Sequence, residues 1–184
     1  KLPSIATVVI LLLTTTAHAE YLGGDIDLIS PLPQSMDLNP DLVALGKRLF
    51  QDPRLSADDS ISCEHCHNLA AGGVDGLVHS IGINGQEGPI NSPTVFNSGF
   101  NPWQFWDARA QSLEEQADGP VTAAKEMGSS WPQVINKLKQ DRSYVQAFAK
   151  QFDNGIAKAN IQSAIATFER SLITPNAPID RYLR

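Results

Sequence analysis

Apolar residues recur with the spacing of an α-helix in several stretches of the chain. The first stretch carries Leu42, Leu45, Leu49 and Phe50, at positions i, i+3, i+7 and i+8. This spacing places the four side chains on one face of a helix. Asn39 is a suitable N-cap, and Pro40 suits the first helical position. Asp52-Pro53 is expected to end the helix, because the residue before a proline disfavours the helical conformation.

Three further amphipathic helices are predicted in the C-terminal part of the chain. Their apolar positions are Val134, Ile135 and Leu138 in the first, Tyr144, Val145, Phe148 and Phe152 in the second, and Ile161, Ala164, Ile165, Phe168 and Leu172 in the third. The expected N-caps are Ser129 or Ser130, Asp141 and Asn160. Thr174-Pro175 is expected to close the last helix.

Two shorter helices complete the predicted elements. One opens at Cys63–His67, and the other runs through Leu113 to Ala117 and ends at Gly119-Pro120. No stretch alternates apolar and polar residues convincingly with period two, so we expect no β-sheet. The predicted fold class is all-α, with the helices joined by long irregular loops.

The longest loop runs from Ala71 to Pro93 and is rich in glycine and other turn-forming residues. Loops longer than about 15 residues within a compact domain are usually functional or disordered. Because candidate chemistry directly precedes this loop, a functional role is the expectation. Residues 20–38, which contain Gly, Pro and Asp, are expected to form an extended lead-in.

The composition suits one domain of moderate size. The chain has 184 residues, of which 42% are hydrophobic and 18% are charged. A chain of this length buries roughly 70% of the surface that its unfolded form exposes. The formal net charge of −6 argues against a nucleic-acid partner and against binding to an anionic membrane surface.

Residues 1–19 have the pattern of a secretory signal peptide. Lys1 precedes a short apolar run from Ile5 to Leu13, and Ala17-His18-Ala19 fits an A-x-A cleavage site. The run is too short to span a bilayer, and an uncleaved anchor is the alternative. Cleavage leaves a secreted chain without a membrane span. Since the first residue is Lys rather than Met, the start of the sequence is expected to be clipped.

Candidate chemistry is concentrated in Cys63-Glu64-His65-Cys66-His67, which matches the C-x-x-C-H pattern of covalent c-type haem attachment. Two thiols one helical turn apart can each add to a haem vinyl group, and the next histidine can then ligate the iron axially. Structural zinc needs four ligands, a thioredoxin-like pair sits in a βαβ unit, and a disulfide across so small a loop would be strained. Haem c is therefore the prediction. It agrees with secretion, because bacteria complete the thioether bonds outside the cytoplasm.

Further motifs accompany this one along the chain. They are Leu45-Gly46-Lys47-Arg48-Leu49-Phe50, Asp52-Pro53-Arg54-Leu55-Ser56, Ser62-Cys63-Glu64-His65-Cys66-His67-Asn68-Leu69, Gly88-Pro89-Ile90-Asn91-Ser92-Pro93-Thr94-Val95-Phe96-Asn97, Gln104-Phe105-Trp106-Asp107-Ala108-Arg109-Ala110, Leu113-Glu114-Glu115-Gln116-Ala117-Asp118-Gly119-Pro120, Glu126-Met127 and Leu172-Ile173-Thr174-Pro175. With these motifs the chain resembles the bacterial dihaem cytochrome c peroxidases, the group that also includes MauG. The resemblance covers nearly everything after residue 19.

The resemblance implies a periplasmic enzyme that reduces hydrogen peroxide to water with electrons from a small cytochrome c or cupredoxin. Members of the family have an N-terminal domain with the peroxidatic haem and a C-terminal domain with a high-potential haem that receives the electrons. Residues 20–184 match the first, a cytochrome c-like haem domain, and the sequence stops near the expected domain boundary at Asp180-Arg181-Tyr182-Leu183. One haem c is expected in this chain and a second in a missing C-terminal half. A homodimer is left open.

The resemblance also implies roles for individual residues. Glu126 matches the distal acid/base residue, which moves a proton between the two oxygens of peroxide, and Gln116 matches its companion in the pocket. Trp106 matches a tryptophan that relays electrons between the two haems, and Phe105 would lie nearer the peroxidatic haem. Asn91 matches a residue that contributes to a calcium site between the domains. Each residue also has a plainer alternative role. Glu126 would be a solvated carboxylate, Gln116 a surface amide, Phe105 and Trp106 core aromatics, and Asn91 a loop asparagine.

One position departs from the family pattern. Many members carry a removable histidine ligand in the glycine-rich loop, and this chain has Ile83 there. Isoleucine cannot ligate iron, so the haem is expected to be five-coordinate at rest. His79 and Met127 are the alternative ligands that the chain offers, and the expectation for His79 is a solvent-facing loop histidine.

Three functions remain open at this point. The first is the N-terminal half of a dihaem peroxidase, and the second is a MauG-like oxidase of a protein substrate. The third is a monohaem electron carrier, for which the chain would have to end at Arg184. Retention of Glu126 and Gln116 speaks against the third, because a carrier needs a sealed six-coordinate iron rather than a polar pocket.

Overall fold

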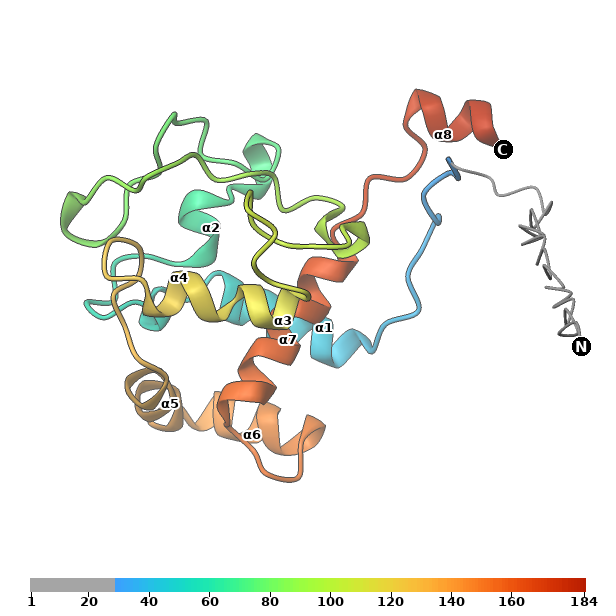
Figure 1. The fold of residues 1–184 in the computed structure, drawn as a ribbon. Coiled ribbons are helices and arrows are strands. Elements are labelled where there is room, and N and C mark those ends of the chain that lie inside the picture. Colours follow the sequence, from blue (N-terminus) through green and yellow to red (C-terminus); the bar gives the residue numbers. More distant parts are fainter. Residues whose placement is uncertain (1–28) are drawn as a thin grey trace, which may run out of the picture. The chain divides into compact units, whose positions relative to one another are not determined.

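The computed structural model describes residues 29–184, so the predicted signal peptide lies outside the described residues. Residues 31–184 form one compact unit. The helices are α1 (Pro40–Phe50), α2 (Cys63–Cys66), α3 (Leu113–Gln116), α4 (Asp118–Thr122), α5 (Trp131–Lys139), α6 (Arg142–Gln151), α7 (Lys158–Ser171) and α8 (Pro178–Leu183) (Figure 1). In the described part the chain forms two isolated bridges and no strand, which confirms the all-α prediction. None of the described helices is long and apolar enough to cross a membrane.

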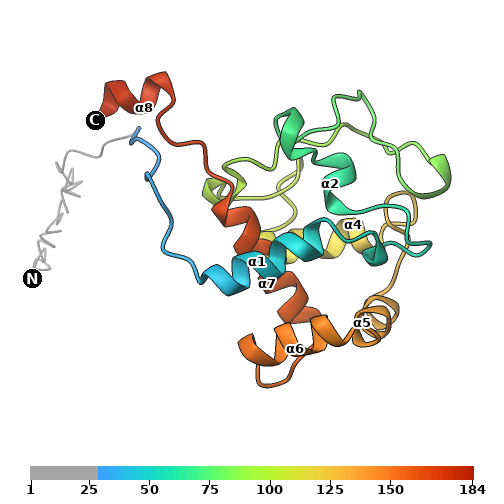
Figure 2. The ribbon, with the colours of Figure 1, turned by 180° about the vertical axis from the view of Figure 1, so that it is seen from behind.

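The two longest helices, α1 and α7, cross each other and form the centre of the unit (Figure 2). Their predicted apolar faces meet, and Leu49, Phe50 and Ile161 are fully buried there. Gly46 lies at the closest approach, where a Cβ atom would overlap the carbonyl oxygen of Ala164. Glycine at this point lets the two backbones come together, so a helix that otherwise prefers alanine carries one here.

The N-terminus of α1 is capped as predicted. The side chain of Asn39 accepts hydrogen bonds from the backbone N–H groups of Asp41 and Leu42, at 3.0 and 3.2 Å. Pro40 occupies the first helical position, where no intrahelical partner for an N–H exists. Residues 29–39 of the predicted lead-in form no helix or strand, and residues 20–28 lie outside the described residues. The backbone N–H of Leu32 donates to Asp180 in α8 at 2.8 Å.

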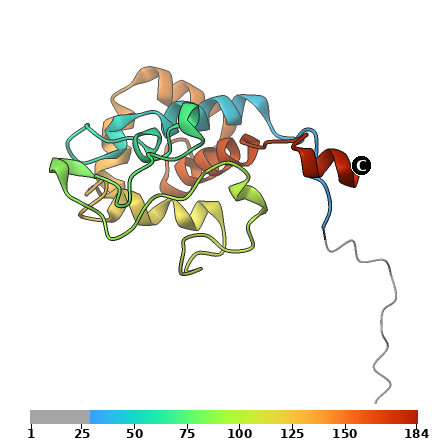
Figure 3. The ribbon, with the colours of Figure 1, turned by 90° about the horizontal axis from the view of Figure 1, so that it is seen from above.

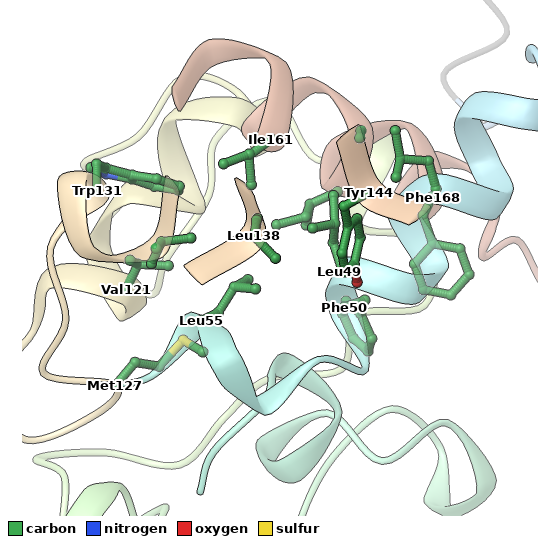
Figure 4. Close-up of a cluster of buried hydrophobic side chains, with 14 of the residues drawn as sticks. Leu49, Phe50, Leu55, Val121, Met127, Trp131, Leu138, Tyr144, Ile161 and Phe168 are labelled. Carbon is green, nitrogen blue, oxygen red and sulfur yellow. The ribbon is translucent and has the colours of Figure 1, made fainter. Parts of the chain in front are cut away.

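Helices α5 and α6 complete the hydrophobic core against α1 and α7 (Figure 4). Leu138 of α5 and Phe148 of α6 are fully buried, as their spacing predicts. Asp141 caps α6 as expected and accepts the backbone N–H of Ser143 at 2.8 Å. Val145 differs from the prediction, because its side chain is 42% exposed and the buried stripe of α6 is narrower than its sequence indicates.

Two helix boundaries differ from the prediction. Asn160 is not the cap of α7, which begins at Lys158; its side chain instead donates to the Asn154 side chain and to the Gly155 carbonyl, both at 2.6 Å. Asn160 thus ties the preceding turn to the helix from within its first turn. Gly119-Pro120 does not end a helix but lies inside α4, because a proline in the first turn removes no intrahelical hydrogen bond.

The segments between α2 and α3 are irregular, as the glycine-rich sequence predicts. They lie on one side of the α1–α7 pair, opposite α5 and α6 (Figures 1 and 2). Viewed from above in Figure 3, they spread over the helical part of the unit. Their regular structure is limited to single 3₁₀ turns such as Ile83–Gly85 and to the isolated bridges Ile81–Glu87 and Gln104–Ala110.

Candidate haem site

The C-x-x-C-H sequence forms the single helical turn α2 and the residue after it. Both thiols are free, and the Cys63 side chain packs against the hydrophobic core. Burial raises the pKa of both the Cys63 and the Cys66 thiols. Two protonated thiols on one turn have the spacing required for addition to the two vinyl groups of a haem.

The ring of His67 is held by the long loop that follows it. Its Nδ1 lies 3.1 Å from the Pro93 carbonyl oxygen and 3.3 Å from that of Gly73. Nδ1 is therefore the protonated nitrogen, and Nε2 keeps its lone pair. Burial lowers the pKa of His67, so the ring is neutral at ordinary pH. A neutral imidazole with one nitrogen fixed by a carbonyl is the usual form of a metal-ligating histidine.

These residues fit a covalently bound haem c. Two free thiols and an imidazole with an available Nε2 are the groups that such a haem needs from the chain. Across residues 29–184, no group of three or more His, Cys, Asp or Glu side chains is placed to hold a metal ion. The glycine-rich loop now has a structural role, because Gly73 and Pro93 within it orient the His67 ring.

Glu126 and Ile83 are brought together by the backbone. The Ile83 N–H donates to the Glu126 carbonyl at 2.8 Å, and the Ile83 side chain is 7% exposed. Gly82 permits this approach, since a Cβ atom there would overlap the Lys125 carbonyl oxygen. The position at which the family carries a distal ligand thus lies beside the segment that carries the candidate acid/base residue.

The Glu126 carboxyl lies in an environment that favours its neutral form. Burial raises its pKa, and the positive charge of Arg109 opposes this effect. A charge on Glu126 in turn raises the pKa of the Cys66 thiol, so the carboxyl is near the attachment turn. A carboxyl with a raised pKa near a cofactor site has the properties of a general acid/base.

Phe105 and Arg109 form a stacked pair in the loop before α3. The Arg109 guanidinium lies 3.4 Å from the centre of the Phe105 ring. The tip of the ring contacts Gly119, where a Cβ atom would lie 2.8 Å from Phe105 Cζ. Phe105 has a positive φ of 67°, which is unusual for an aromatic residue and marks a constrained loop. Arg109 belongs to a motif of the sequence, but nothing in its residue type indicated that it would act on Glu126.

Trp106 and Asn91 also lie together. The Trp106 Nε1–H donates to the Asn91 carbonyl at 3.2 Å, and the Trp106 side chain is 63% exposed. The structure therefore joins the residue expected at the calcium site to the residue expected to relay electrons. Gln116 ends α3 and is half-buried, and no hydrogen bond joins its side chain to Glu126 within the described part of the chain.

The two alternative ligands have different surroundings. His79 hydrogen-bonds through Nδ1 to the Gly88 carbonyl at 3.0 Å, and its side chain is 40% exposed. Met127 is 3% exposed and packs in the hydrophobic core near Leu55 (Figure 4).

A buried carboxyl in α7, Glu169, was missed in the sequence. Ile161, Ile165 and Glu169 stand at positions i, i+4 and i+8 and therefore share one helix face. This spacing could have indicated that Glu169 is buried. It is 6% exposed.

Comparison with known proteins agrees with this picture. The chain is 52% identical over 157 residues to the cytochrome c peroxidase Ccp of Escherichia coli (strain K12), a match that covers 85% of this chain and 34% of the relative. It is 41% identical over 154 residues to the methylamine utilization protein MauG of Methylorubrum extorquens, covering 83% and 44%. The chain thus spans about half the length, or less, of these curated relatives.

A solved structure, of a MauG-like protein associated with microbial copper homeostasis, superposes with a TM-score of 0.75 at 30% identity. The superposition covers 87% of this chain and 50% of the other. The diheme peroxidase BthA from Burkholderia thailandensis superposes with a TM-score of 0.64 at 24% identity, which supports the fold alone. The fold is therefore the all-α, cytochrome c-like fold expected from the sequence. Residues 40–184 match the family model of the di-haem cytochrome c peroxidases, and the chain belongs to this family.

Proposed function

We propose that the protein containing this chain reduces hydrogen peroxide to water at a haem c attached to Cys63 and Cys66, with His67 as the axial ligand. One observation carries the proposal: the half-buried Glu126 carboxyl has a raised pKa and acts electrostatically on Cys66 of the attachment turn, and the backbone carbonyl of the same residue accepts from Ile83. The electrons come from a small cytochrome c or cupredoxin. Residues 1–19 direct the chain to the periplasm, and one haem is bound per chain of this length.

A bound haem would supply the iron centre for peroxide and pass on the two electrons that come from the donor protein. Glu126 would take a proton from one oxygen of peroxide and return it to the oxygen that leaves as water, and two protons from solvent would complete the second water. Such a transfer needs a carboxyl that both accepts and donates near neutral pH, which burial of Glu126 supports. Gln116 provides a further polar group in the pocket.

Ile83 supports a peroxidatic function over electron transfer alone. Its apolar side chain stands where many relatives carry a blocking histidine, so the proposed haem keeps an open position for peroxide at rest. A MauG-like oxidase of a protein substrate has the same need for an open position. The second candidate therefore rests on this residue and on the similarity to MauG.

The exposed Trp106 and its hydrogen bond to Asn91 support the remaining assignments. We assign Trp106 to electron relay toward a second haem domain, and Phe105 to the side of the peroxidatic haem. Asn91 contributes to a calcium site at that boundary through its side-chain oxygen, because its carbonyl already accepts from Trp106.

Substitution of Glu126 by Gln tests the proposal. In the protein that includes the second haem domain, Glu126→Gln should lower peroxide turnover by about a hundred- to ten-thousandfold, the usual contribution of general acid/base catalysis. The absorption spectrum of the attached haem should stay close to that of the wild type. Glu115→Gln, which changes an exposed carboxylate of α3, is the matched control and should retain activity. Turnover of the Glu126 variant at the wild-type rate would remove this residue from the mechanism.

A further inference from the structure

One buried carboxyl group has neither a partner nor a part in the proposed peroxide chemistry. Glu169 lies in the last turn of α7, and its Oε2 atom makes no hydrogen bond in the described part of the chain. Its neighbour Arg170 is engaged elsewhere, since the guanidinium donates to the two carboxylate oxygens of Glu114 at 2.6 and 2.8 Å. Buried polar groups are nearly always paired, so an unpaired one requires an explanation.

The last turn of α7 borders the haem site. The Phe168 ring packs edge-on against Phe50 at 5.2 Å between ring centres, and Phe50 in turn lies 6.5 Å from the His67 ring. Glu169 acts electrostatically on the first attachment cysteine, since a charge on its carboxylate raises the pKa of the Cys63 thiol. A change of charge at Glu169 therefore alters the electrostatic potential at the haem-attachment turn.

Burial and two charged groups act on the Glu169 carboxyl. Burial raises its pKa to about 8, the charge of Arg170 on α7 opposes this, and that of Glu114 on α3 adds to it. From α2, Cys63 becomes an uncharged thioether once haem is attached. The C-terminal end of α7 carries a partial negative charge, which further disfavours a carboxylate there. The group is thus mainly a carboxylic acid at neutral pH and ionises around pH 8, so a redox-linked exchange of its proton belongs to that pH range.

We propose that Glu169 is a proton-binding residue of the haem site, whose carboxyl takes up one proton from solvent when the haem iron gains one electron. The added electron places negative charge next to a buried carboxylate, and in a medium of low dielectric the two repel. Proton uptake removes this repulsion, and loss of the electron releases the proton. The electron comes from a one-electron donor, here the small redox protein proposed above.

This inference rests on the haem attachment in the proposed function but not on peroxide reduction by Glu126. The inference on Glu169 and the peroxidase proposal can therefore fail separately. The inference on Glu169 requires the midpoint potential of the haem to fall as pH rises, because oxidation favours the carboxylate. One pH unit is a tenfold change in proton concentration, which corresponds to about 59 mV for a one-electron couple. The slope should approach this limit in a window around pH 8, the pKa region of Glu169.

Spectroelectrochemical titration of the haem-loaded protein, from about pH 6 to about pH 10, tests the inference. The wild type should show the pH-dependent potential, and Glu169→Gln should show a nearly constant one. The amide has the size and neutral charge of the protonated acid, so this variant should still attach haem. Glu64→Gln is the matched control: this carboxylate lies in α2 but is hydrogen-bonded at the surface to Gln51, and its loss should leave the slope unchanged.

Two results would overturn the inference. A wild-type potential that stays constant across this pH range would exclude redox-linked protonation of any group, whether or not the variant folds. A slope that persists in Glu169→Gln would assign the proton to another group, such as a haem propionate. Retained slope in Glu64→Gln together with its loss in Glu169→Gln is the expected outcome.

Discussion

Arg109 connects two residues of the candidate haem site through different interactions. It stacks on the Phe105 ring at 3.4 Å and lowers the pKa of Glu126 by its charge. It also pairs with Asp107 at 2.8 Å, and its side chain is 54% exposed. Solvent therefore weakens the electrostatic effect of Arg109 on Glu126. The Phe105 ring and the Asp107 carboxylate nevertheless hold the guanidinium in place. We infer that Arg109 positions Phe105 and keeps part of the Glu126 population ionised.

Removal of this charge should alter the pH dependence of peroxide turnover. In Arg109→Gln the pKa of Glu126 should rise further, because burial then acts without an opposing cation. The acid limb of the kcat/KM profile, which reports the ionised base of the free enzyme, should shift to higher pH. Arg109→Lys keeps the charge and should restore much of the profile. An unchanged acid limb in Arg109→Gln would show that the limb belongs to another group.

The residue types predicted the cysteines that attach the haem and the histidine that ligates the iron. They did not predict the backbone carbonyl groups that orient this histidine. The C-x-x-C-H spacing is local, so Cys63, Cys66 and His67 can be recognised from the sequence alone. The carbonyls of Gly73 and Pro93 that orient His67 lie six and 26 residues along an irregular loop. A backbone carbonyl carries no signal in the residue type, so this contact follows only from the path of the loop.

At the scale of elements, the close packing of α1 against α7 stabilises the hydrophobic core. A Cβ atom on Gly46 would meet the carbonyl group of Ala164 and Cβ of Phe168. Backbone atoms cannot rotate away, so Gly46→Ala should move the helices apart. We expect a loss of stability of about 1–3 kcal/mol, as for other overpacked cores, although alanine favours helix by about 1 kcal/mol.

Thermal unfolding of the haem-loaded protein measures this effect. Lys47→Ala, at the next and exposed position of α1, introduces the same side chain without a clash and should stay within about 0.5 kcal/mol of the wild type. Equal stabilities for the Gly46 and Lys47 variants would mean that the crossing can relax at no cost.

The longer helices were predictable because their periodicity reports burial directly. Of the shorter helices, α2 and α3 were predicted close to their observed bounds, whereas α4 and α8 were not. Asn160 and Pro120 carry the signals of a helix boundary, but Asn160 bonds back to the preceding turn from within α7 and Pro120 lies in the first turn of α4. Helix α8, with an exposed Ile179 and Tyr182, has too few buried residues to produce a periodic pattern.

At the scale of the whole molecule, the proposed peroxide site lies in the described unit, whereas the electrons are proposed to arrive through a second domain. His67 and Glu126 lie near the attachment turn, whereas Trp103 and Trp106 are 50% and 63% exposed in the loop before α3. In a family with two haem domains, the exposed Trp106, which donates to the expected calcium residue Asn91, suits the passage of electrons from a second domain. In the proposed division of labour, peroxide reacts in the described unit, and electrons enter through a second haem domain.

This division predicts that residues 20–184, loaded with one haem, do not sustain peroxidase turnover. Reduction of one peroxide to water consumes two electrons, whereas a small cytochrome or cupredoxin delivers one at a time. A single haem cannot readily hold both oxidising equivalents and also draw electrons from the donor, so the isolated chain should react with peroxide once and then stall. Steady-state oxidation of a reduced cytochrome c by the isolated chain, compared with the longer protein at equal haem content, measures this. Continuous turnover at a comparable rate would show that the chain accepts donor electrons directly and that its peroxide chemistry needs no second domain.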